Sequence, residues 1–131
     1  EQVTFTGHAI EVRLCAEDAD KGFMPQSGTM ALWHMPTQLR VEHAMRSGAE
    51  IPPYYDSLIA KLIAYGHDRD EAIARMRRAL DLFIVEGIQS SIPLHQRILA
   101  DPEFQAAKID TQFVQRFLER SKAHETALAG A

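Results

Sequence analysis

The sequence contains a single cysteine, Cys15, so no internal disulfide can form, and one thiol suits a reducing compartment such as the cytoplasm. No apolar run approaches the roughly 18 residues that indicate a membrane span. No basic segment followed by an apolar one marks a signal peptide. The 14 lysines and arginines are outnumbered by 18 acidic residues, for a formal net charge of -4, so a basic footprint for nucleic acid is missing.

Motifs for metal and phosphate binding are missing as well. The chain has no C-x-x-C, no H-E-x-x-H and no paired-histidine spacing, so a metal site has no support. The 7 glycines never cluster into a phosphate-cradling loop, and the domain cannot hold ATP by its own motifs. A Ser/His/Asp triad can be drawn from many combinations, but no spacing selects one.

The length of 131 residues, 46% of them hydrophobic, allows one domain with a sizeable core. The sequence opens at Glu1 without a methionine, and we expect a piece of something longer. Residues 121–131 are small and polar, which predicts a flexible tail and leaves residues 1–120 as the domain.

The stretch from His8 to Asp18 carries the most information. Ile10, Val12 and Leu14 alternate with Glu11 and Arg13, which predicts a half-buried strand over His8–Leu14 that is followed by a turn. An arginine on a rigid strand, next to a strand exit, can hold a planar, anion-like oxygen. The alternative is an ordinary edge-strand arginine.

Further strands are expected before residue 65. Residues 3–6 predict a short strand, and residues 18–28 predict a loop. Residues 29–35 and 39–43 predict an antiparallel pair joined by a short connection. Leu58–Tyr65 also suits a turn and a half of helix, but Gly66 stops it at a strand-like length, so we expect a strand buried on both faces.

Helices follow. Asp68 with Glu71 predicts a capping box for a helix whose apolar stripe begins at Ile73, and a short strand is possible at residues 83–85. Ser90 or Ser91 can cap a second helix. Asp101 starts a short helical turn that ends near residue 107, and Asp110 or Thr111 starts the last helix. The predicted fold is α+β, with mostly antiparallel strands followed by three to four packed helices.

Three other sets of residues have two interpretations each. Trp33, Tyr54 and Tyr55 could form a surface for a ring-shaped ligand, but we favour a place in the core. The arginines at 75, 77 and 78 favour a solvated, partly neutralised helix face over a basic site. Lys61, the only charge in its strand, either reaches the rim or pairs with an acid such as Glu11.

Several segments, in this order, resemble one family. They are E-x-R-L with A-E-D over residues 11–18, F-x-P-x-S-G over 23–28, P-Y-Y-D-S-L-I-x-K-L over 53–62, and R-D-x-A-I-x-R-M with A-L over 69–80. Together they resemble the C-terminal domain of biotin carboxylase, the ATP-grasp component of biotin-dependent acyl-CoA carboxylases. The resemblance extends from about Gly7 to Leu118, and the first and third segments are specific in combination.

The resemblance implies a reaction and a residue for it. In this family ATP and bicarbonate give carboxyphosphate, whose CO2 passes to the ureido nitrogen of biotin on a carrier protein. The matching arginine, Arg13, is implied to hold the ureido oxygen as it becomes enolate-like, a cation aimed at charge that develops in the transition state. An arginine stays protonated at the pH where a biotin nitrogen must lose its proton.

The same resemblance implies roles for three further residues. Thr111 matches a position that lines the adenine side of the nucleotide cleft, and Arg40 and Asp56 match positions at a two-fold dimer interface. Asp56 is also plausible as a local hydrogen-bond acceptor. The connection over residues 35–39, which leads directly to Arg40, is shorter than the glycine-rich one that the family often has. Ser90-Ser91 stands where the family often has Thr-Asn, and both pairs can cap a helix.

The implied partners lie outside the sequence. The ATP-binding loop, the magnesium carboxylates and the general base come from upstream domains in this family, so we expect the piece alone to be inactive. Other partners are the biotin carboxyl carrier protein and a carboxyltransferase, with acetyl-CoA as the expected acyl-CoA. Two alternatives remain: the C-terminal domain of a purine-synthesis ATP-grasp ligase, and a non-catalytic interaction module in which Arg13 and Arg40 pair with acids.

Overall fold

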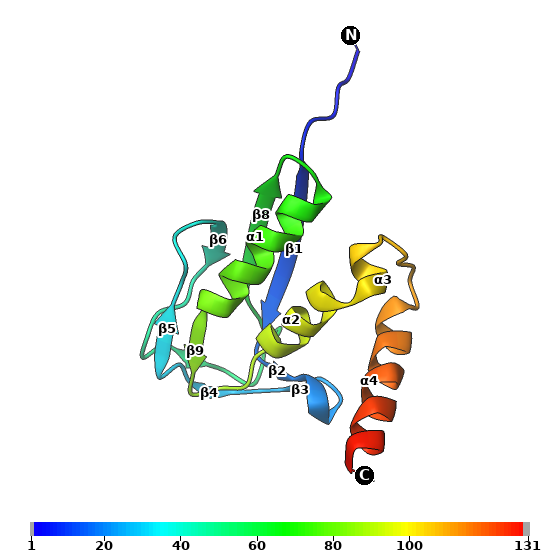
Figure 1. The fold of residues 1–131 in the computed structure, drawn as a ribbon. Helices are drawn as coiled ribbons and strands as arrows, with labels where there is room; N and C mark the ends of the chain where they lie inside the picture. Colours follow the sequence, from blue (N-terminus) through cyan, green and yellow to red (C-terminus); the bar gives the residue numbers. More distant parts are fainter. Residues whose placement is uncertain (1, 130–131) are drawn as a thin grey trace. The chain divides into compact units, whose positions relative to one another are not determined.

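The computed structural model describes residues 2–129 and confirms the α+β fold, with antiparallel strands in the first half followed by helices (Figure 1). The chain divides into two compact units, one as far as Leu99 and one from Ala100 onward. No helix within residues 2–129 is long and apolar enough to cross a membrane.

The first unit is built on a three-stranded antiparallel sheet in the order β1 (His8–Cys15), β8 (Leu58–Gly66), β6 (Arg40–His43). Helix α1 (Arg69–Leu82) packs along β8 and β1 (Figure 1). Among residues 2–129, six large apolar side chains are fully buried, including Leu14 of β1, Leu62 of β8 and Met76 of α1. The predicted strands at residues 8–14 and 58–65 are therefore confirmed.

The burial of β8 differs from the prediction. Ala60, Leu62 and Ala64 are buried beneath α1, whereas Lys61 and Tyr65 on the other face are exposed. On that face Ile59 is buried and Ile63 is half-buried, so the predicted burial on both faces holds at the start of the strand and is wrong from Lys61 onward. Short side chains beneath α1 let the helix approach closely, and the opposite face of the sheet carries charges instead.

Three two-stranded sheets complete the first unit. They pair β2 (Glu17–Asp18) with β3 (Met24–Pro25), β4 (Gly28–Thr29) with β7 (Glu50–Ile51), and β5 (Leu32–His34) with β9 (Ile84–Glu86); a short 3₁₀ helix, η1, spans Ala19–Lys21. The predicted pairing of residues 29–35 with 39–43 is wrong, because β5 pairs with β9 and β6 pairs with β8. Trp33 explains the choice: its ring packs edge-on against Phe83, just before β9, at a centroid distance of 4.9 Å.

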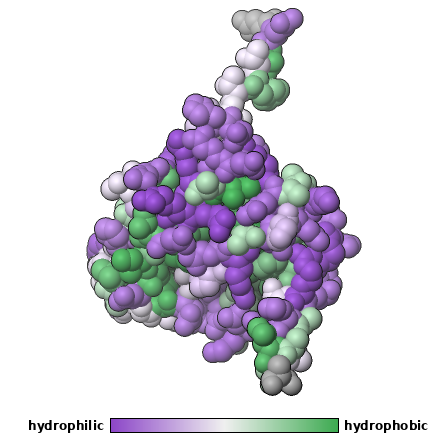
Figure 2. All heavy atoms as spheres, viewed as in Figure 1, coloured by the Kyte–Doolittle hydropathy of each residue, from purple (hydrophilic) through white to green (hydrophobic). Residues whose placement is uncertain are grey.

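Two other local predictions are also wrong. The segment expected to be a loop, residues 18–28, holds the end of β2, then η1, β3 and the start of β4. Residues 3–6 form no strand, and Val3 and Phe5 are 80% and 94% exposed on a segment that projects from the surface in Figure 2. An alternating apolar pattern without a neighbouring strand has no hydrogen-bond partners to hold it.

The start of α1 has the predicted N-cap, but the return bond from Glu71 goes to the residue before the cap and not to the amide of Asp68 itself. Asp68 is the N-cap and its Oδ1 accepts a hydrogen bond from the Glu71 amide at 2.9 Å. Glu71 Oε2 in turn accepts from the His67 amide at 2.6 Å, which lowers the pKa of Glu71. Helix α2 (Ile92–Ala100) follows β9, with Ser90 accepting from the Ile92 amide at 3.4 Å.

The second unit contains α3 (Pro102–Gln105) and α4 (Phe113–Ala129). Asp101 caps α3 and pairs with Arg120 of α4 at 2.9 Å, while Phe113 stacks near Phe117 at 6.0 Å between ring centroids. The segment expected to be a flexible tail, residues 121–131, continues α4 with mostly exposed side chains as far as Ala129. Residues 130–131 lie outside the described residues.

Candidate functional site

Arg13 lies near the end of β1 and is exposed, as predicted for the polar face of this strand. Its neighbours Val12 and Leu14 are buried on the opposite face, beneath α1. Within residues 2–129 its guanidinium forms no ion pair. A rigid strand therefore carries an unneutralised cation.

The strand register places a second cation directly beside it. Lys61 of β8 is opposite Arg13 on one side and opposite Glu42 of β6 on the other. Glu11 was the acid considered as a partner of Lys61 from the sequence. Among the described residues, no ion pair joins the two. Directly opposed like charges in a sheet are destabilising. This row of the sheet face consequently has positive charge available for an anionic group.

The carboxylate of Glu42 is already engaged. It accepts a hydrogen bond from Arg40, two residues earlier on β6, at 2.6 Å. Arg40 also lines an open groove of about 540 Å³ together with Ala9, Ile63 and Tyr65. Arg40 is thus paired with an acid, whereas Arg13 has no such partner in the part of the chain that the structure describes.

The exit of β1 is held by the start of α2. Ser91 donates its amide to the Cys15 carbonyl at 3.0 Å, and its Oγ accepts from the Cys15 amide at 2.9 Å. His95 Nε2 donates to the carbonyl of Arg13 at 2.9 Å, and Ser91 Oγ lies 3.4 Å from the same oxygen. Burial lowers the pKa of His95, although the hydrogen bond to Arg13 and the charge of Glu17 act in the opposite direction.

The sequence predicts for His95 only a solvated or singly hydrogen-bonded side chain, without a place in a site, and for Ser91 only a capping role. The His95 contact joins residues 82 positions apart, and no spacing rule connects a helix side chain to a distant strand carbonyl. The presence of a histidine one turn after the serine was the only available signal.

The two most specific motifs meet at the same strand exit. Ser57 Oγ donates to a carboxylate oxygen of Glu17, and the Ser57 carbonyl accepts from the Ala16 amide at 2.8 Å. Burial and the nearby charge of Glu17 raise the pKa of the Cys15 thiol. The A-E-D and P-Y-Y-D-S segments are therefore structural neighbours that fix the chain immediately after Arg13.

The aromatic residues divide between core and surface. Trp33 is buried, as favoured, but Tyr54 and Tyr55 are 85% and 81% exposed, so their favoured place in the core is wrong. The two prolines immediately before them have no place in a sheet, and the chain forms a turn at Pro53 and Tyr54 that leaves both tyrosines at the surface. Asp56 Oδ1 accepts from the Leu58 amide at 2.9 Å, which is the local role considered for it.

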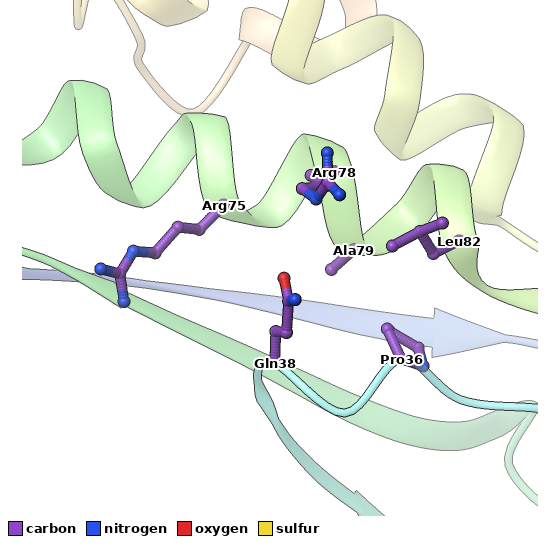
Figure 3. Close-up of a pocket in the computed structure, with 6 residues that line it drawn as sticks. All are labelled: Pro36, Gln38, Arg75, Arg78, Ala79 and Leu82. Carbon is purple, nitrogen blue, oxygen red and sulfur yellow. The ribbon is translucent and has the colours of Figure 1, made fainter.

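A cavity of about 360 Å³ lies between α1 and the connection after β5 (Figure 3). Pro36 and Gln38 face Arg75, Arg78 and the end of α1 across it. Arg75 pairs with Glu71 at 2.6 Å, in agreement with a partly neutralised helix face. None of the predicted site residues lines this cavity.

Thr111 belongs to the second unit, where it is exposed in the turn before α4. Asp110 Oδ1 accepts from the Gln112 amide and pairs with Arg116, both at 2.9 Å, so Asp110 rather than Thr111 stabilises the start of this helix. Within residues 2–129 no group of three or more histidine, cysteine or acidic side chains is placed to hold a metal ion. The described part of the chain offers no ligand set for magnesium.

Comparison with known proteins identifies relatives. Biotin carboxylase 1 of Bacillus subtilis is 47% identical over 119 residues, which cover 89% of this chain and 26% of that protein. The biotin carboxylase of Pseudomonas aeruginosa is 43% identical over 124 residues, or 93% of this chain and 27% of that protein. The chain therefore spans only 26% and 27% of the length of these two relatives.

A solved structure agrees with these relatives. The biotin carboxylase domain dimer of the Hydrogenobacter thermophilus 2-oxoglutarate carboxylase, in complex with MgADP, ADP and bicarbonate, superposes with a TM-score of 0.84 at 42% identity. The match covers 87% of this chain and 26% of that one. Residues 11–116 match the family model described as the biotin carboxylase C-terminal domain, which decides against a purine-synthesis ligase. The chain belongs to the biotin carboxylase C-terminal domain family.

Proposed function

We propose that this chain is the biotin-site domain of a biotin carboxylase, a carbon-nitrogen ligase, and that Arg13 stabilises negative charge on the ureido oxygen of biotin. Removal of a proton from the ureido nitrogen increases the charge on that oxygen, and a cation fixed beside it lowers the barrier. One observation carries the proposal: Arg13 is an exposed guanidinium on a packed strand, without an ion pair within residues 2–129.

The rest of the reaction depends on other parts. We propose that upstream domains of the same chain bind ATP and Mg²⁺, and that biotin arrives on a carboxyl carrier protein in the cytoplasm. A carboxyltransferase then passes the carboxyl group to an acyl-CoA, for which acetyl-CoA is our candidate. The small share of each relative that this chain covers, 26% for the Bacillus subtilis protein, supports a requirement for further domains, and the piece alone should be inactive.

Thr111 is proposed to line the adenine side of the nucleotide cleft. Its exposure in the turn before α4 supports this role, because an exposed hydroxyl can accept a ligand without displacing a protein partner. Replacement by valine keeps the shape of the side chain and removes the hydroxyl. We expect Thr111→Val in the parent enzyme to raise the KM for ATP with little change in the KM for biotin.

Arg40 and Asp56 are proposed to lie at the interface of a parent homodimer. The open groove beside Arg40 and the exposed position of Asp56 support an intermolecular contact. Arg40→Glu places an acid beside Glu42, and we expect it to shift the parent enzyme toward monomers in analytical ultracentrifugation.

A non-catalytic interaction module is the second candidate, and the Arg40–Glu42 ion pair at 2.6 Å is what favours it. Biotin-dependent ATP cleavage by the parent enzyme separates the two candidates. We expect Arg13→Ala to lower this activity about 100-fold or more, the effect of removing one oxyanion donor. The KM for ATP should stay unchanged.

Arg77→Ala is the matched control, because Arg77 is an exposed arginine on α1 and no proposed role depends on it. Near-normal turnover by a folded Arg13→Ala variant would show that Arg13 is an ordinary edge-strand residue. Loss of activity in both variants would point to general destabilisation.

A further inference from the structure

Strand β1 lies at an edge of its sheet, because the strand order is β1-β8-β6. An edge strand has one row of backbone groups without a neighbouring strand. The ladder to β8 is also interrupted at this end, where the register shifts between Leu14 and Cys15. The backbone of Arg13 therefore lies where the sheet itself gives the least support.

Helix α2 supplies the missing contacts. The Arg13 carbonyl accepts from His95 Nε2 at 2.9 Å, and the amide and carbonyl of Cys15 bond to Ser91 at 2.9 and 3.0 Å. Ser91 directly precedes α2 and His95 lies one turn later, so both side chains reach the strand from the same end of the helix. A carbonyl carries no hydrogen, so the imidazole must carry its proton on Nε2 to make this bond.

We propose that His95 is a positioning residue that fixes the backbone of Arg13 and so aims its guanidinium at the substrate. This inference rests on the function proposed for Arg13. It assigns His95 no contact with biotin, nucleotide or the reacting atoms. Groups that stabilise a transition state must be held within about 0.5 Å of the productive geometry. A displacement of about 1 Å can reduce the rate about 100-fold.

The test uses the parent enzyme and biotin-dependent ATP cleavage. His95→Leu removes the nearer donor and leaves only Ser91 Oγ, 3.4 Å from the Arg13 carbonyl oxygen. We expect kcat to fall about 10-fold, because the displacement should stay below the full 1 Å. The KM for ATP and the melting temperature of the nucleotide-bound enzyme should change little. His95→Gln retains an N–H donor of similar reach and should recover most of the activity.

Gln96→Leu is the matched control. Gln96 is the next residue on α2, and its side chain bonds to Asp81 at 3.0 Å rather than to β1. This variant should retain normal kcat. If His95→Leu fails to fold, His95→Asn replaces it, since that amide is too short to reach the Arg13 carbonyl but remains polar.

The double variant separates this inference from the proposed function. If His95 acts through Arg13, His95→Leu should have no further effect on kcat in an Arg13→Ala background. A further 10-fold loss there, failure of His95→Gln to recover activity, or normal kcat in a folded His95→Leu enzyme each overturns the positioning role. If Arg13→Ala alone leaves turnover unchanged, the proposed function fails and this inference fails with it.

Discussion

Gly87 lies at the end of β9, at the start of the connection to α2, and it should tolerate no side chain. Its φ of +99° is one that L residues rarely adopt. A β-carbon there would lie 2.3 Å from the Thr29 carbonyl oxygen and 2.7 Å from the Ala31 amide nitrogen. Both are backbone atoms, so relief requires movement of the chain between β4 and β5.

The magnitude combines three terms. A left-handed backbone costs an L residue about 1–2 kcal/mol, and the stiffer unfolded chain returns about 0.4–1 kcal/mol. Overlap with fixed atoms adds about 1–3 kcal/mol. We therefore expect Gly87→Ala to lower the free energy of unfolding by about 2–4 kcal/mol.

Gly22→Ala is the matched control, because Gly22 has a φ of +67° and a β-carbon there would meet no atom within 4 Å. Gly22→Ala should lower the free energy of unfolding only through the backbone conformation, by about 0.5–1 kcal/mol after the effect on the unfolded chain is subtracted. Urea unfolding followed by far-ultraviolet circular dichroism measures both variants. Equal losses for the two would refute the claim that the backbone of β4 and β5 excludes a side chain at Gly87.

Three further predictions follow, two on single residues and one on a pair of residues. Asp68→Ala should lower the free energy of unfolding by about 1 kcal/mol, because the Glu71 amide loses its 2.9 Å acceptor; urea unfolding checks it, and an unchanged midpoint contradicts it. A double-mutant cycle with Arg13→Gln and Lys61→Gln should give a repulsive coupling of about 0.2–1 kcal/mol that weakens in salt, and an attractive coupling would exclude the opposed geometry. The pKa of His95 is lowered in the fold, so the unfolded chain binds its proton more readily. The free energy of unfolding should fall as the pH drops below about 6.5, and it should fall less in His95→Gln.

The local elements could be predicted because their signals are local. The alternation around Arg13 and the pairing of Asp68 with Glu71 specify a strand and a helix start within a few residues. The partners of the strands could not be predicted in the same way. Apolar segments that are neighbours in the sequence, such as residues 29–35 and 39–43, favour a hairpin. In the structure β5 pairs with β9 instead, and the ring of Trp33 packs on Phe83 beside this pair.

In the candidate site, too, the residues with a local sequence signal could be predicted and those that depend on distant contacts could not. Arg13 could be found from its strand pattern and from the family resemblance, and the exposure of its side chain agrees with that prediction. Lys61 was recognised as an unusual charge, but its place beside Arg13 depends on a strand register that the sequence does not encode locally. His95 could not be found, because its partner is a backbone carbonyl and carries no sequence signal.

The arrangement around Arg13 separates the fixing of its backbone from the charge of its side chain. Helix α1 buries the neighbouring Leu14 from one side, and α2 bonds the Arg13 carbonyl at the sheet edge. Neither helix presents an acid that pairs with the guanidinium within residues 2–129. A fixed carboxylate partner would neutralise the cation before any reaction begins and would compete with charge that develops on a substrate. Contacts that hold the main chain and leave the side chain unpaired are therefore what an electrostatic catalyst on an edge strand requires.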